Sequence, residues 1–100
     1  MSGYRYNSEW NDENELRCLV IFNQLEEKKF PRGMQIKLCR EMSRVTKLDV
    51  GNISAKVCNY KSVAGVNNDS NASIKTIEYY RRYGKLGIPE IQKIIEKRNV

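Results

Sequence analysis

Asn52, Lys56 and Asn59 lie four and three residues apart in the stretch "VGNISAKVCNYKSV", residues 50–63. This spacing places three polar side chains on one face of an α-helix. In the major groove of duplex DNA, an asparagine can form two hydrogen bonds with adenine, and a lysine can donate to the acceptors of guanine. The stretch is therefore either a face that reads base edges or an ordinary solvated helix surface.

Further polar side chains near this face could hold the phosphate backbone, which positions a protein without reading the sequence. Ser54 and Lys61 border the face and are expected to reach phosphates. The remaining predicted backbone contacts are Arg40, Arg44 and Lys47 just upstream, and Arg81 and Arg82 further along the chain.

The charge of the chain is positive and uneven. The 100 residues carry a formal net charge of +6. Residues 1–30 hold six acidic and four basic side chains, a net charge of −2, whereas residues 31–100 hold six acidic and fourteen basic ones, a net charge of +8. A basic region beside an acidic one favours a surface that meets a polyanion, although a solvated lysine-rich surface has the same composition.

Residue types argue against catalysis and against a metal site. The chain contains no histidine, which removes the commonest general base. Its cysteines, Cys18, Cys39 and Cys58, are widely spaced and form no CxxC pair, so a structural zinc site is not expected. We expect these cysteines to be reduced and buried, and we expect no enzymatic activity and no cofactor.

The N-terminal half predicts three helices. Asp12 and Glu15 fit a capping box that opens a helix reaching about Lys29, with a wide apolar stripe. Trp10, just ahead of it, is expected to anchor in the core. A second helix is expected from Gly33 to Thr46, with Met34, Leu38, Met42 and Val45 facing inward. After a short link, Asp49 can cap a third helix from Val50 to about Val63.

The C-terminal part predicts a loop and two further helices. Residues 64–73 are rich in Asn and Ser and lack apolar periodicity. Ser70 or Ser73 can cap a fourth helix that ends at Gly84 as a left-handed cap, with Ile74, Ile77, Tyr80 and Tyr83 inward. Pro89 suits the first turn of a fifth helix that runs to Arg98 and turns Ile91, Ile94 and Ile95 inward.

These elements predict an all-α fold. A helix followed by two helices joined by a tight link is typical of a trihelical helix-turn-helix or Myb-like core, here with one or two C-terminal helices added. Any small helical bundle would show the same spacing. Residues 1–8 are expected to be a flexible arm and residues 9–100 a single domain. No apolar stretch is long enough to span a membrane, and we expect a cytoplasmic protein.

The order of two phrases adds a resemblance. Trp10, then Ser54, Lys56, Asn59, Tyr60 and Ser62, then "SNAS" at residues 70–73, resembles the N-terminal helical domain that precedes the nuclease part of HNH restriction-type endonucleases. The resemblance covers most of residues 10–83. It implies a DNA-handling domain related to restriction or phage defence. It does not transfer catalysis, because an HNH nuclease needs histidine and this chain has none.

We therefore expect a non-enzymatic protein that binds double-stranded DNA and reads the major groove with the helix around residues 50–63. The alternative is a small phage-type inhibitor or adaptor that binds a host or phage protein in a defence complex. For that alternative, the acidic side chains of the first helix, Glu15 among them, would form a docking surface. A homodimer on two half-sites also stays open.

Overall fold

Helices make up the regular structure in the part of the chain that the structure describes. The computed structural model describes residues 12–66 and 74–98, and within them it contains five α-helices and no strand. The helices are α1 (Asp12–Glu27), α2 (Met34–Thr46), α3 (Val50–Val63), α4 (Ile74–Tyr83) and α5 (Ile88–Arg98). The radius of gyration is 12.6 Å, close to the value of about 13 Å expected for a compact chain of this length. The all-α prediction is confirmed.

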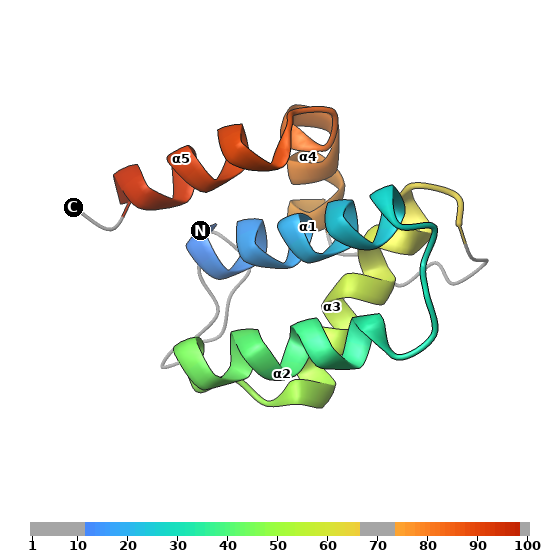
Figure 1. Cartoon of the computed structure of the whole chain (residues 1–100). Helices are drawn as coiled ribbons and strands as arrows, with labels where there is room; N and C mark the ends of the chain where they lie inside the picture. Colours follow the sequence, from blue (N-terminus) through green and yellow to red (C-terminus); the bar gives the residue numbers. More distant parts are fainter. Residues whose placement is uncertain (1–11, 67–73, 99–100) are drawn as a thin grey trace.

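Helix α1 forms the centre of the molecule. It packs against each of the other four helices, with α2 and α5 on opposite sides of it (Figure 1). From Asn14 to Leu25 only Arg17 and Gln24 are not buried. A helix surrounded in this way needs apolar residues around most of its circumference, which explains the wide apolar stripe of this segment.

The connection between α2 and α3 is short and well capped. Lys47 follows α2 in a left-handed conformation with φ 64°, and its backbone N–H donates to the Ser43 carbonyl. The Asp49 carboxylate accepts a hydrogen bond from the Asn52 backbone N–H at 3.2 Å, as the sequence predicts for this cap. The link therefore consists of residues 47–49, and α3 has the predicted bounds.

Two apolar residues that were predicted to face inward are exposed. Val45 is 67% exposed and Ile74 is 77% exposed, whereas both were expected to face inward. In α4 the buried positions are instead Thr76 and Tyr79. Because aliphatic and aromatic residues are spread around α4, either of two faces of the helix could turn inward. The packing of α4 on α1 and α3 selects the face that is buried.

Gly84 does not act as the left-handed cap that its position suggested, because its φ lies outside the positive range that Gly33 and Gly65 adopt. A Cβ at Gly84 would instead collide with the Tyr80 carbonyl oxygen and would lie 2.9 Å from the Tyr80 ring. Close approach to the preceding turn therefore requires glycine here.

The predictions for Trp10, for the arm at residues 1–8 and for Ser70 and Ser73 as caps lie outside the described residues. Within the described ranges, no helix is long and apolar enough to cross a membrane.

The Gly84→Ala substitution should destabilise the protein by about 1–3 kcal/mol, because the new methyl group forces Tyr80 and its helix turn to move. Urea unfolding followed by circular dichroism measures the change. Gly87→Ala is the matched control, since its Cβ would meet its nearest atom at 3.7 Å, and it should cost under about 1 kcal/mol. Equal effects of the two substitutions would contradict this explanation of Gly84.

Candidate nucleic-acid interface

The outer face of α3 is narrower than the sequence suggested. Gly51, Asn52 and Ala55, in the first two turns, are exposed, and Asn59 is half-buried. The opposite face packs Ile53, Val57 and Tyr60 into the core with no solvent exposure. Because α3 packs against α1, α2 and α4, this strip is the most exposed part of α3 among the residues that the structure describes.

Lys56 does not project outward with the two asparagines. Its ammonium group lies 3.3 Å from a carboxylate oxygen of Glu15, and the Glu15 side chain is fully buried. Lys56 Nζ also donates to the Thr76 hydroxyl at 3.4 Å. The prediction that Lys56 points outward is therefore wrong, because a buried carboxylate on α1 attracts the cation that lies nearest on α3.

Glu15 is the centre of a buried polar cluster that joins three helices. The Tyr60 hydroxyl of α3 donates to the Glu15 carboxylate at 2.8 Å. The Thr76 hydroxyl of α4 donates to the same carboxylate oxygen at 3.3 Å. These hydrogen bonds reach one carboxylate oxygen, and the Lys56 ammonium group beside the other oxygen supplies the opposite charge that a buried carboxylate needs in a medium of low polarity.

The capping-box interpretation of Glu15 is therefore wrong, and so is its place in an exposed acidic docking surface. The residue fits a capping box in sequence, but its side chain points into the core, where it contacts residues 41 and 61 positions further along the chain. A local motif does not reveal partners that only the tertiary fold brings together. One sequence signal was available: Glu15 immediately precedes Leu16 in the most apolar part of the chain.

Ser54 and Lys61 face α2 and not an open surface. Gln35 of α2 donates to the Ser54 hydroxyl at 2.9 Å and to the Cys58 sulfur at 3.6 Å. The Lys61 ammonium group donates to the side-chain oxygen of Gln35 and lies 5.4 Å from the centre of the Phe30 ring. Both side chains therefore form contacts that hold α3 on α2, and these contacts disfavour their expected role in reaching phosphates.

The cations predicted to contact the DNA backbone from α2 are exposed to solvent. Arg40, Arg44 and Lys47 are all exposed and follow one another along the outer side of α2 and into the link. Arg81 and Arg82 are also exposed, in the last turn of α4. Helix α3 packs against both α2 and α4 (Figure 1).

The cysteines show no features of a reactive or ligating site within the described residues. Burial raises the pKa of the Cys18 thiol well above its ordinary value, and the nearby Glu15 carboxylate raises it further. Burial also raises the pKa of Cys39, with Cys58 as the second cause. Thiols of this kind stay protonated and are poor nucleophiles. Over residues 12–66 and 74–98, no group of three acidic, cysteine or histidine side chains could hold a metal ion.

Comparison of the chain with protein-family models, with curated proteins and with solved structures gives no match. The interface is therefore interpreted from its own geometry.

The Lys56→Met substitution should destabilise the protein by about 3–5 kcal/mol, because it leaves the Glu15 carboxylate buried without its counter-charge. Urea denaturation measures the loss. The control is Glu13→Gln, which breaks the partly exposed pair that Glu13 forms with Arg17 at 2.7 Å and should cost under about 1 kcal/mol. If Lys56→Met cost no more than the control, the ion pair would not be a major structural contact.

Proposed function

We propose that this protein binds double-stranded DNA through a helix-turn-helix unit formed by α2 and α3. The observation that carries the proposal is the exposed start of α3, where Asn52 and Ala55 lie next to a link and a helix whose outer side is basic. Helices α1, α2 and α3 pack against one another, as in a trihelical DNA-binding core.

The geometry of the link supports this assignment. Helix-turn-helix units join two helices at a steep angle through a turn of three or four residues that often contains glycine. Here three residues connect α2 and α3, and Lys47 takes the left-handed conformation that glycine usually adopts. Figure 1 shows α3 running steeply away from α2 towards α4.

The exposed residues match the chemistry of the major groove. In a helix-turn-helix unit, the N-terminal residues of the second helix contact base edges. Both Asn52 and Ala55 are exposed; Asn52 would pair with adenine, and the Ala55 methyl group would contact the methyl group of thymine. Asn59, one helical turn beyond Ala55, is the third candidate on the same strip.

The side chains of α2 supply the charge. Arg40, Arg44 and Lys47 are exposed near the reading strip, and each can neutralise a phosphate. Arginine is well suited to this role because its planar group donates two parallel hydrogen bonds to phosphate oxygens. Arg81 and Arg82 extend the phosphate contacts on the α4 side of α3.

The resemblance to the helical domain of HNH restriction-type endonucleases agrees with this proposal, with one change of role. Lys56 and Tyr60 belong to the residue pattern on which the resemblance rests. In this structure both contact Glu15 inside the core, so these two residues maintain the fold. Asn59 stays on the outer strip. We therefore assign base reading to Asn52, Ala55 and Asn59, and backbone contacts to the cations of α2 and α4.

Duplex DNA should bind with an affinity that falls steeply as salt rises, and Arg40→Ala with Arg44→Ala should flatten this dependence. Each lost phosphate contact lowers the slope of log affinity against log salt by about 1. Fluorescence anisotropy with a labelled duplex measures both quantities. The matched control is Lys93→Ala with Lys97→Ala, which removes the same charge from exposed positions on α5. No binding at low salt, or an equal loss in the control, would contradict the proposed interface.

Replacing Asn52 and Asn59 by alanine should relax the sequence preference while the salt slope stays unchanged. A good asparagine–adenine pair contributes about 1–3 kcal/mol of discrimination. Selection from a random duplex pool, run with the original chain and the variant, measures the preference. A variant that selects the same site as the original chain would place the reading surface away from α3.

A further inference from the structure

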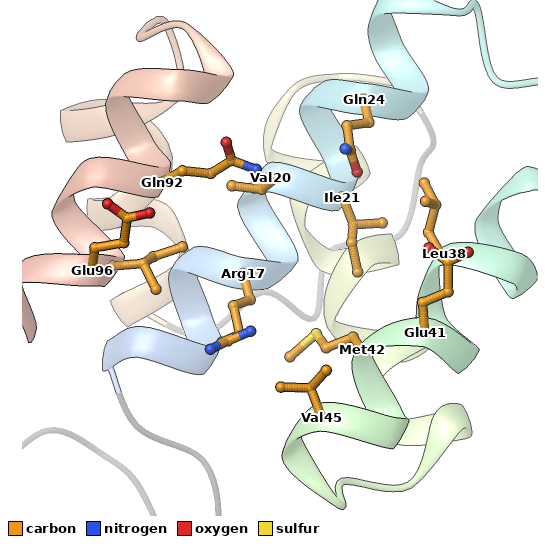
Figure 2. A pocket seen from close by; sticks show the side chains of 11 residues that line it. Arg17, Val20, Ile21, Gln24, Leu38, Glu41, Met42, Val45, Gln92 and Glu96 are labelled. Atoms are coloured by element: carbon orange, nitrogen blue, oxygen red, sulfur yellow. The ribbon is translucent and has the colours of Figure 1, made fainter. Parts of the chain in front are cut away.

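A groove crosses α1, with α2 on one side and α5 on the other. Its volume is about 520 Å³, within the range of about 300–1,000 Å³ that ligand sites occupy. Its apolar lining comes from all three helices: Val20 and Ile21 of α1, Leu38, Met42 and Val45 of α2, and Ile95 of α5. Figure 2 shows the groove from close by, with α1 between the other two helices.

The groove has an exposed apolar rim. Val45 is 67% exposed, although a single turn away Met42 is only 6% exposed. The sequence predicted Val45 as a core residue because it continues the inward stripe of α2. Val45 does lie on the same stripe of α2 as Met42. It is exposed because α5 packs on the other side of α1 and does not reach across the groove to cover it (Figure 2).

Two acidic side chains stand on opposite walls of the groove. Glu41 lies on α2 and Glu96 on α5, with α1 between them (Figure 2). Arg17, the cation of the lining, pairs with Glu13 at 2.7 Å. Neither Glu41 nor Glu96 forms an ion pair with any residue that the structure describes. The groove therefore carries negative charge in a chain whose net charge is +6.

We propose that this groove binds a cationic amphipathic helix of a partner protein. The apolar stripe of that helix would cover the lining around Val20, Met42 and Val45, and flanking lysine or arginine side chains would pair with Glu41 and Glu96. Amphipathic helices dock in hydrophobic grooves in this way through anchors at i, i+3, i+4 and i+7.

The dimensions of the groove match such a helix. Its lining extends from Arg17 to Gln24 on α1 and from Leu38 to Val45 on α2, so the α1 floor and the α2 wall are each two helical turns long, about 10 Å. Two turns present three or four anchors on one face. The volume accommodates these side chains and not a whole helix, so the backbone of the partner would lie above the groove.

The charge pattern favours a cationic partner over the other occupants. Two copies of this chain placed groove to groove would bring Glu41 and Glu96 of both copies together, which is unfavourable. The carboxylates of Glu41 and Glu96 would also repel the phosphates of a nucleic acid. The docking surface and the proposed DNA interface use neighbouring faces of α2, since Glu41 lies one helical turn from Arg44.

The probe is a synthetic peptide of about fifteen residues with leucines at the anchor spacing and lysines on both sides of the stripe. We expect saturable binding, measured by calorimetry and by nitrogen-15 chemical-shift changes at the groove residues. Two control peptides have the same leucines with glutamates in place of lysines, or the same composition with scattered leucines. Both should bind more weakly than the cationic helix.

The Glu41→Lys and Glu96→Lys double variant should weaken binding of the cationic peptide by about tenfold, because two attractions become repulsions. The matched control is Glu26→Lys with Glu27→Lys, which makes the same charge change at exposed positions outside the groove and should leave the affinity within about twofold. Val45→Asp tests the apolar contact, and its exposed site should let the variant fold with an unchanged circular dichroism spectrum.

Four results would overturn the proposal: no saturable binding, equal binding of the scattered-leucine peptide, equal losses in the groove variant and its control, or self-association that Val45→Asp abolishes. The outcome is independent of DNA binding. The Arg40→Ala and Arg44→Ala variant should lose affinity for duplex DNA and keep its affinity for the peptide, whereas the single variant Glu96→Lys, on α5, should weaken peptide binding and keep its affinity for duplex DNA.

Discussion

The arrangement of α1, α3 and α4 depends on one buried charge. Glu15 has no solvent exposure, and moving an ionised carboxylate from water into a protein costs several kcal/mol unless charge and hydrogen bonds replace the water. Lys56 supplies the charge, and Tyr60 and Thr76 supply hydrogen bonds. Few relative positions of these helices satisfy all three contacts, so we infer that the cluster fixes how α3 sits on α1.

This constraint also limits what α3 can offer to a ligand. Lys56 pairs with Glu15, and Lys61 and Ser54 bond to Gln35 of α2. Some polar residues of α3 therefore fix the helix in place, and the others face outward. The outward group is small and led by Asn52. A rigidly placed helix with a narrow polar strip is suited to reading a few base pairs, because precise placement lowers the entropy lost on binding.

The molecule carries cations and acidic side chains on neighbouring faces. Arg40, Arg44 and Lys47 are exposed on α2 and its link, while Glu41 and Glu96 line the groove over α1. Opposite charges on separate surfaces select different partners, since each surface repels the ligand of the other. A small protein built in this way could hold DNA with one surface and a cationic helix with another, which is the geometry of an adaptor.

Local patterns in the sequence were sufficient for the helices: the bounds of α3, its Asp49 cap and the buried Ile91 and Ile95 follow from periodicity and capping, which depend on neighbours along the chain. The same patterns were wrong for Val45 and Lys56. Each lies at a position of its helix whose surroundings are set by a helix distant in sequence: α5 leaves Val45 uncovered, and Glu15 of α1 draws Lys56 inward. Residue type and spacing determined what each helix could do. Only tertiary packing decided which side chains remained free to do it, because burial and charge pairing arise between helices and not within them.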